Sequence, residues 1–214
     1  MSVQKIHLLC SERHLPEQVF EKYHDAVWAG VDRGTLILLE HDIQPVFAVG
    51  DFDSVSEAAR EWIANKMPID PVPAEKADTD LALAIEQAID RGYQDICIYG
   101  ATGGRLDHFM GAMQLLKTPA YQTHHVKLID CQNEITLLTA GEHQMNHDKQ
   151  YTYISFMPAS DEVVISLTGF KYNLERKVLS TGTTLTVSNE FVQQTGHIHI
   201  HKGMVYQMRS RDYI

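Results

Sequence analysis

The stretch Ile96-Cys97-Ile98-Tyr99-Gly100-Ala101-Thr102-Gly103-Gly104-Arg105-Leu106-Asp107-His108 combines the end of a strand, a turn and the start of a helix. Its first four residues form a short apolar run bounded by glycine, which is typical of a buried strand. The glycines that follow predict a tight turn, because glycine adopts positive φ and lets the backbone approach a ligand closely. A strand that leads directly into a helix is typical of a parallel α/β sheet.

The residues before and after this stretch continue the alternation of strand and helix. We expect helices at Ser54–Lys66 and Asp80–Arg91, the second with one apolar face at three- and four-residue spacing. Strands alternating with helices predict a mostly parallel sheet that is covered on both sides. The expected strands are Ile6–Cys10, Ala26–Gly30, Val46–Val49, Ile96–Tyr99 and Val126–Ile129.

After about Gly141 the sequence changes to short runs of period-two character separated by Gly, Asn and Ser. We expect antiparallel strands here, with the polar segment Gly141–Gln150 as a connector. The predicted fold is an N-terminal, mostly parallel α/β (Rossmann-like) domain over residues 1–140, followed by a C-terminal antiparallel β-sandwich over residues 141–214. The expected strands of the second domain are Tyr151–Met157, Val163–Leu167, Thr183–Val187, His197–His201 and Val205–Met208.

Composition excludes several classes of function. The 214 residues are 44% hydrophobic and carry a formal net charge of −10, which argues against a nucleic-acid partner because phosphate-backbone binding needs clustered Lys and Arg. No segment approaches the ~20 apolar residues of a membrane span. Cys10, Cys97 and Cys131 lack the close spacing of a disulfide framework or zinc site. We therefore expect a cytoplasmic protein without a membrane or nucleic-acid partner.

The segment Gly50-Asp51-Phe52-Asp53-Ser54 is a candidate metal site. It follows an apolar run, and carboxylates at i and i+2 of an extended chain point to the same side, ~7 Å apart. Mg²⁺ prefers hard oxygen ligands and usually takes one or two carboxylates together with substrate phosphates. The alternative is that Asp53 or Ser54 caps the helix that follows.

The glycine-rich turn is a candidate phosphate site. The start of a helix offers free N–H groups and a positive dipole end to an anion, and Arg105 could bind phosphate oxygens in bidentate fashion. The turn matches neither the Walker A loop nor the Gly-x-Gly-x-x-Gly dinucleotide motif. The alternative is a tight turn with a surface Arg.

Two further clusters contain acids close to strand or helix ends. In Glu75-Lys76-Ala77-Asp78-Thr79-Asp80, Thr79 or Asp78 is a good N-cap. Beside the Asp51 and Asp53 loop, however, Lys76 is a candidate phosphate ligand and Asp80 a candidate metal ligand. Gly30-Val31-Asp32-Arg33-Gly34 again places an acid and glycines at a strand end.

The segment His197-Ile198-His199-Ile200-His201 places three imidazoles on one strand face. Histidines in this arrangement can bind Zn²⁺ or Ni²⁺. A solvated face of a half-buried strand, with Ile198 and Ile200 pointing inward, explains the pattern without a metal and is the interpretation we favour.

Taken in order, these motifs resemble the thiamine pyrophosphokinase family, and its bacterial members in particular. The resemblance extends from about Ala26 to Gly203. The long glycine, Arg, Asp and His motif is the most specific part of it. The matching segments are Gly30–Gly34, Gly50–Ser54, Lys76 with Thr79-Asp80, Gly100–His108, Ile129-Asp130 and Ser188-Asn189-Glu190.

The resemblance implies transfer of a pyrophosphate group from Mg-ATP to the hydroxyl of thiamine, giving thiamine diphosphate and AMP. It also implies a homodimer, with ATP bound by the α/β domain and thiamine bound between subunits. The implied catalytic residues are Asp32, Asp51, Asp53 and Asp80, of which Asp51, Asp53 and Asp80 would hold Mg²⁺. The implied ATP-binding residues are Ser54, Lys76, Thr79, Thr102, Gly103, Gly104, Arg105, Asp107 and His108, and the implied thiamine-binding residues are Ser188 and Asn189.

The chain departs from the family pattern at Ala77, Ala82 and Ala112, where Asp, Glu and Asn are common. Two alternative functions follow from the residues. A metal-dependent phosphatase or nucleotidyltransferase could use the same Asp-x-Asp, but it leaves the glycine turn and Ser188-Asn189-Glu190 without a role. A non-catalytic sensor of thiamine or nucleotide is favoured only by Ala77 and Ala82.

Overall fold

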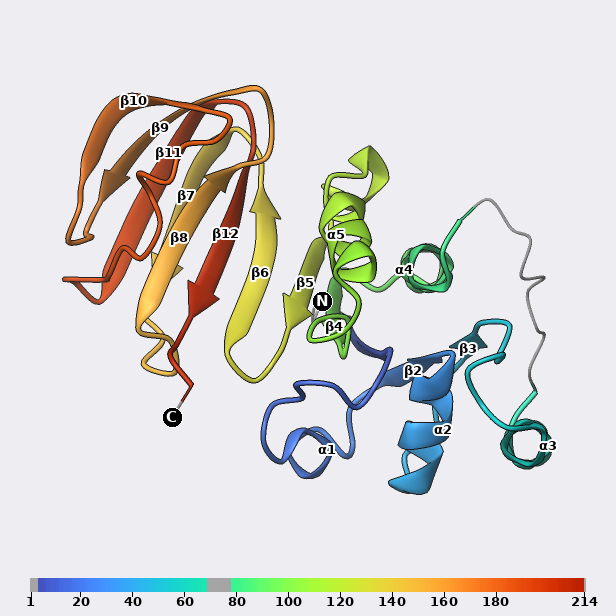
Figure 1. Cartoon of the computed structure of the whole chain (residues 1–214). Coiled ribbons are helices and arrows are strands. Elements are labelled where there is room, and N and C mark those ends of the chain that lie inside the picture. Colours follow the sequence, from blue (N-terminus) through green and yellow to red (C-terminus); the bar gives the residue numbers. More distant parts are fainter. Residues whose placement is uncertain (1–3, 69–77, 214) are drawn as a thin grey trace. The chain divides into compact units, whose positions relative to one another are not determined.

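The computed structural model describes residues 4–68 and 78–213 (Figure 1). Lys76, the expected phosphate ligand, lies outside the described residues. The chain divides into two compact units, residues 1–131 and 132–214. No helix in the described part of the chain is long and apolar enough to cross a membrane.

The described strands of the first unit form a parallel sheet in the order β3-β2-β1-β4-β5. This confirms the predicted parallel α/β architecture. β3 is shorter than expected, because only Ala48 and Val49 are in register with β2. The strands are β1 (Lys5–Leu9), β2 (Trp28–Val31), β3 (Ala48–Val49), β4 (Asp95–Tyr99) and β5 (His125–Ile129).

The order of these strands creates a topological switch point. From β1 the chain builds outward through β2 to β3, and it then returns to place β4 on the other side of β1. The segments that leave the carboxyl ends of β1 and β4 therefore diverge, and ligands of open α/β sheets bind in the crevice at such a point.

The helices of the first unit differ from expectation mainly in number. The structure adds α1 and α2, which the sequence patterns did not predict. In α2 the run Leu36-Ile37-Leu38-Leu39 is continuously apolar, so it lacks the period that identifies a helix. The helices are α1 (Val19–Lys22), α2 (Arg33–Glu40), α3 (Glu57–Lys66), α4 (Asp80–Asp90) and α5 (Leu106–Leu115), with a 3₁₀ turn at Pro119–Tyr121.

The start of α3 corrects one expectation. The helix begins at Glu57 rather than at Ser54, and the Ser56 hydroxyl accepts a hydrogen bond from the Ala59 N–H at 3.2 Å. Ser56 is therefore the N-cap, and the interpretation of Asp53 or Ser54 as the cap is wrong. Both residues lie outside the helix and are exposed.

Apolar side chains from the sheet and α2 form the core of the first unit. Leu9, Trp28 and Tyr99 pack with Ile37 and Leu38 of α2. Each such buried side chain contributes roughly 1.5–3 kcal/mol. Strand side chains alternate between faces, so Ile6 and Leu8 of β1 point to the face opposite Leu9. The helix α4 contacts β2 and β3.

The second unit is antiparallel throughout its described strands. β6 (Asn133–Leu138), β12 (Val205–Ser210) and β8 (Tyr153–Pro158) pair in that order. A four-stranded sheet has the order β10-β9-β11-β7, from β10 (Leu174–Ser180), β9 (Glu162–Thr168), β11 (Thr195–Lys202) and β7 (Gly141–Asn146). Ile154, Phe156, Ile165, Leu167, Ile198 and Ile200 belong to one buried cluster of this sandwich.

Three expectations for the second unit need correction. The segment Gly141–Gln150, expected to be a connector, contains the strand β7, which pairs with β11. Its residues are mostly polar, so the sequence shows no clear strand alternation there. Thr183–Val187 forms turns rather than a strand. The strands β6 and β10 were not expected. β10 is mostly exposed and polar and lies at one edge of its sheet, so it lacks the apolar pattern of a strand.

Candidate active site

The candidate site residues of the first unit follow the carboxyl ends of its strands. Cys10 follows β1, Asp32 follows β2, Gly50 follows β3, Gly100 follows β4 and Asp130 follows β5. Carboxyl ends of parallel strands lie at one edge of a sheet, so segments far apart in the sequence meet there. We call this group the strand-end site.

Asp32 links the ends of β2 and β3. Its backbone has φ 49° and ψ −121°, a conformation that non-glycine residues rarely adopt. Its Oδ1 accepts a hydrogen bond from the Phe52 N–H at 3.3 Å. A Cβ at Gly50 would lie 2.0 Å from this oxygen, and Gly50 has φ +150°. The glycine is therefore needed for the carboxylate of Asp32 to lie against the loop that carries Asp51 and Asp53.

The loop itself presents two carboxylates outside any helix. Asp51 Oδ1 accepts a hydrogen bond from the Asp53 N–H at 3.0 Å, and Asp53 is exposed while Asp51 is half-buried. Phe52 has φ 57° and a buried ring. Arg60 Nη2 donates to the Phe52 carbonyl oxygen at 2.6 Å, which holds the loop against α3.

Several charged side chains lie close enough to the Cys10 thiol, at the end of β1, to shift its pKa. Burial is the main reason that the pKa of this thiol is raised to about 12. The carboxylates of Asp32 and Asp80 also raise the pKa, whereas the Arg13 guanidinium lowers it. Asp32, Asp80 and Arg13 therefore all act on one thiol. The raised pKa favours the protonated thiol at neutral pH.

Asp80 reaches the site through the capping of α4. The Thr79 hydroxyl accepts a hydrogen bond from the Ala82 N–H at 3.3 Å, so Thr79 is the N-cap, one of the two residues expected. Asp80 occupies the first turn and is half-buried. A carboxylate is stabilised there by the positive end of the helix dipole.

Among the described residues, no three His, Cys, Asp or Glu side chains are grouped closely enough to hold a metal ion by themselves. The expected ligand set of Asp51, Asp53 and Asp80 is therefore not a preformed cage. Its donors are nevertheless of the type that Mg²⁺ prefers, and Mg²⁺ normally completes its shell with phosphate oxygens and water.

The glycine turn after β4 is held by the segment that follows β1. The Ser11 hydroxyl donates to the Gly100 carbonyl oxygen at 2.7 Å. A Cβ at Gly100, which has φ +71°, would lie 2.1 Å from the Ser11 carbonyl oxygen. At Gly103, which has φ +72°, a Cβ would lie 2.6 Å from the His14 ring. Sequence reasoning missed residues 10–14, although a polar run at the end of a predicted strand was a usable signal.

Thr102 anchors the same turn to the end of β5. Its hydroxyl donates to Asp130 Oδ2 at 2.8 Å, and both side chains are buried. The hydroxyl proton of Thr102, an expected ATP-binding residue, is thus directed at Asp130. The pair fixes the position of the exposed residues Gly103 and Gly104.

Arg105, Asp107 and His108 lie at the start of α5, and all three are exposed. Arg105 Nε donates to Asp107 Oδ1 at 3.1 Å and Nη2 donates to Oδ2 at 2.5 Å. The hydrogen bond from Arg105 lowers the pKa of Asp107. The charge of Arg105 is therefore matched by a bidentate partner.

The expected thiamine residues of the second unit lie beside β8. Ser188 is exposed and has φ 56°. Asn189 is buried; its Oδ1 accepts hydrogen bonds from the N–H groups of Tyr172 and Glu190, and its Nδ2 donates to the Tyr172 carbonyl oxygen. Asn189 therefore ties two segments together, which fixes the exposed Ser188 next to it.

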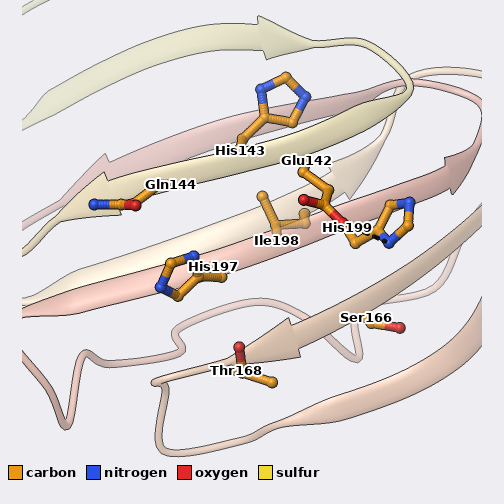
Figure 2. Close-up of a pocket in the computed structure, with 8 residues that line it drawn as sticks. All are labelled: Glu142, His143, Gln144, Ser166, Thr168, His197, Ile198 and His199. Carbon is orange, nitrogen blue, oxygen red and sulfur yellow. Dashed lines mark ion pairs between the residues drawn. The ribbon is translucent and has the colours of Figure 1, made fainter.

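A pocket of about 520 Å³ lies elsewhere, on the four-stranded sheet (Figure 2). Ile198 and Ile200 of β11 are buried while His197 is exposed and His199 and His201 are partly exposed, which confirms the interpretation of a solvated strand face. Figure 2 shows Glu142 directed at His199, whose Nδ1 is 3.8 Å from Glu142 Oε1. The described residues contain no three-ligand metal group here either.

A doubly wound α/β unit with acids, glycines and cations at its switch point defines a class of α/β proteins that bind ligands at strand ends. Comparisons with known proteins identify the family within this class. The thiamin pyrophosphokinase catalytic domain matches residues 20–129, and the thiamin pyrophosphokinase vitamin B1 binding domain matches residues 142–205. The chain belongs to the thiamin pyrophosphokinase family.

Individual relatives agree over most of the chain. A thiamine pyrophosphokinase of Bacillus subtilis is 42% identical over 188 residues, which are 87% of this chain and 88% of the relative. The crystal structure of the enzyme from this species has a TM-score of 0.88 at 38% identity and covers 98% of this chain and 100% of its own. The thiamin pyrophosphokinase structure from Geobacillus thermodenitrificans has a TM-score of 0.87 at 38% identity, with coverage of 97% and 98%.

Proposed function

We propose that this protein is an enzyme that transfers the pyrophosphate group of ATP to the hydroxyl of thiamine, giving thiamine diphosphate and AMP. The observation that carries the proposal is the coincidence of a family match over both units with acids and a glycine turn at the switch point of the sheet. The family match alone gives the reaction, and the strand-end site gives it a location in the chain.

We assign ATP to the strand-end site. The exposed Gly103 and Gly104 let phosphate oxygens approach the backbone at the start of α5, whose free N–H groups favour an anion. His108 lies one turn further along the helix, and Ser54 and Thr79 lie on the neighbouring loop and helix start. In this assignment Thr102 acts by fixing the turn through Asp130.

Mg²⁺ is the metal that this donor set suits, with Asp51, Asp53 and Asp80 as its protein ligands. When bound, the ion neutralises charge on the phosphate oxygens. Asp32 has its carboxylate oriented by the Phe52 N–H, so it stays turned toward the loop of the other acids. The strained backbone at Asp32 and Phe52 is the kind of feature that clusters at active sites.

The reaction forms one bond and breaks another at the β-phosphorus of ATP. The thiamine hydroxyl oxygen bonds to this phosphorus as the bond to the oxygen bridging the α- and β-phosphates breaks, and AMP leaves with that oxygen. A carboxylate accepts the hydroxyl proton, and Asp53 and Asp80 are the candidates. Such transfers depend mostly on positioning and on electrostatic stabilisation.

We assign thiamine to the β-sandwich part, expected over residues 141–214, and ATP to the α/β part, expected over residues 1–140. The rigid hydrogen bonding of Asn189 supports a role for Ser188 as the side chain presented to thiamine. The vitamin B1 binding family model covers this segment.

A homodimer in the cytoplasm completes the proposal. Leu106 is 78% exposed and Met110 53% exposed on one face of α5, and apolar Leu185 and Val192 are exposed in the second unit. Leu106 and Met110 are four residues apart and so lie on the same face of α5, and an exposed apolar patch is typical of an interaction site. The three cysteines are free thiols, as is usual in a reducing compartment. Light scattering after size-exclusion chromatography should give twice the mass of the chain.

The test is incubation of the protein with ATP, Mg²⁺ and thiamine, with identification of every product. AMP and thiamine diphosphate in equal amounts are expected. ADP with thiamine monophosphate would indicate an ordinary kinase, and release of inorganic phosphate without a thiamine product would indicate a phosphatase. Binding of thiamine or ATP without any product would indicate a sensor.

A further inference from the structure

The segment Cys10–His14 lies at the switch point of the sheet, although no motif identified it. It leaves the carboxyl end of β1, and its Ser11 is hydrogen-bonded to Gly100 at the end of β4. The Cys131 N–H donates to the His14 carbonyl oxygen at 2.7 Å, which ties the segment to the end of β5 as well. Residues 10–14 therefore border the switch point, which is where ligands of open α/β sheets bind.

The cations around this crevice differ in whether their charge is already matched. Arg33 Nε is 3.1 Å from Glu12 Oε2, and Arg105 is paired with Asp107. Arg60 donates to the Phe52 carbonyl oxygen. Arg13 is exposed and, within the part of the chain that the structure describes, forms no ion pair.

The guanidinium of Arg13 lies directly over the glycine turn. A Cβ at Gly104 would be 1.9 Å from Arg13 Nη1 and 2.9 Å from Cζ. Gly104 lacks the left-handed φ of Gly100 and Gly103. Its backbone conformation would therefore accept a side chain, and it is Arg13 that occupies the space.

We propose that Arg13 binds the phosphate oxygens of ATP at the Gly103-Gly104 turn, an inference that rests on the proposed function. The described site is rich in carboxylates, so a polyphosphate needs cations as well as a metal ion there. An unpaired guanidinium offers a planar set of donors that suits phosphate oxygens. Arg105 would first have to leave Asp107, whereas Arg13 is available without such a cost.

The test compares Arg13→Gln with the wild-type protein. Loss of a charge-assisted contact should raise KM for Mg-ATP about 10- to 100-fold and weaken the binding of inorganic tripolyphosphate to a similar extent. KM for thiamine and the melting temperature should stay within experimental error. Arg13→Lys, which keeps the charge but loses the planar fork, should recover part of the affinity.

Arg91→Gln is the matched control, because it removes the same charge from the same unit. Arg91 lies at the C-terminal end of α4, where its guanidinium donates to the Val46 carbonyl oxygen and lies over the Phe47 ring, away from the strand-end site. This control should leave KM for Mg-ATP unchanged. Unchanged ATP and tripolyphosphate affinities in Arg13→Gln, with a wild-type protein that makes thiamine diphosphate, would overturn the role of Arg13 alone. A wild-type protein that makes no thiamine diphosphate would overturn the proposed function instead.

A second variant tests where Arg13 acts. Gly104→Ala should displace the guanidinium and weaken Mg-ATP binding, and this effect should largely vanish in the Arg13→Gln background. Effects that simply add would show that the two residues do not act together, which would contradict binding by Arg13 at the turn.

Discussion

The strand-end site of the first unit and the histidine face of the second unit, His197, His199 and His201, are both concentrations of polar side chains, but they are built in opposite ways. The site brings together short segments that lie far apart in the sequence, and several of them have positive φ. The histidines come from one strand with a regular period of two. Only the first arrangement brings different kinds of chemical group together at one edge of a sheet.

His201 of the histidine face forms hydrogen bonds with neighbouring side chains of the same sheet. His201 Nε2 is 2.8 Å from Ser166 Oγ, and Arg176 Nη1 is 3.2 Å from His201 Nδ1. Because a guanidinium can only donate, Nδ1 must accept and the ring is neutral. Desolvation, followed by the charges of His199 and Arg176, lowers the pKa of His201. A conspicuous motif can thus be internally bonded, while a functional residue such as Arg13 has no motif.

The largest effect that separates the two regions should come from Asp53→Asn. Loss of this carboxylate should lower kcat about 100- to 10,000-fold, the range for a positioned acid or base, with little change in melting temperature because Asp53 is exposed. Steady-state assays and thermal unfolding check this. Asp90→Asn removes an exposed carboxylate at the far end of α4 and should keep normal activity. Normal turnover in Asp53→Asn would exclude a chemical role.

The second effect concerns a histidine of the first unit whose surroundings contrast with the histidine face. Burial, with a smaller contribution from Lys5, lowers the pKa of His7 from 6.5 to about 4. The unfolded chain therefore binds more protons than the folded protein between these two pH values. The contribution of neutral His7 to the free energy of unfolding is complete above pH 6.5 and is lost as the pH falls toward 4. The loss should be about 3 kcal/mol.

Urea unfolding of wild-type protein and His7→Gln at several pH values measures this effect. The variant is expected to be less stable at neutral pH, because His7 stacks on Tyr99 and its Nδ1 bonds to the Tyr99 hydroxyl at 3.2 Å. The difference between the two proteins should narrow as the pH falls from 6.5 to 4. A difference that is independent of pH would contradict the lowered pKa of His7.

A smaller effect is expected from Thr102→Val, which keeps the shape of the side chain and removes its hydroxyl. The buried Asp130 loses one partner, which should cost about 1–3 kcal/mol of unfolding free energy. KM for Mg-ATP should rise because the turn is less well fixed. If KM rises without loss of stability, the Thr102 hydroxyl contacts ATP directly instead.

The smallest effect is expected from the combined substitution of His197, His199 and His201 by Gln. These side chains lie on a solvated face, so the unfolding free energy should change by less than about 0.5 kcal/mol per site. Activity with ATP and thiamine should not change. Assays with and without added Zn²⁺ would show a difference between variant and wild type only if the histidine face binds metal in a way that matters for turnover.

The sequence was sufficient for the fold class, and it identified the acids and glycines that follow β2, β3 and β4. Strands with continuous apolar runs and the amphipathic helix α4 were recognisable because their period or length is distinctive. The edge strand β10 and the helix α2 were not, since one is polar and exposed and the other is continuously apolar. In both, tertiary position rather than local pattern determines the structure.

Within the site, motifs identified the acids and glycines but not the contacts that position them. The N-cap of α3 is Ser56, two residues beyond Ser54, because its hydroxyl and not that of Ser54 accepts the hydrogen bond from the helix start. Arg13 and Ser11 become visible only when β1 and β4 are neighbours, because no spacing rule connects residue 11 with residue 100. Asn189 was expected as a ligand contact, and only the structure reveals its hydrogen bonds to Tyr172.

The hydrogen bond between Ser11 and Gly100, whose residues are 89 positions apart, has a consequence for the order in which the protein matures. A growing chain can pair β1, β2 and β3 early, yet the switch point to which we assign ATP does not exist until β4 has been made and has paired with β1. ATP therefore cannot assist the early steps of folding, and it stabilises only chains in which this late, non-local pairing is complete.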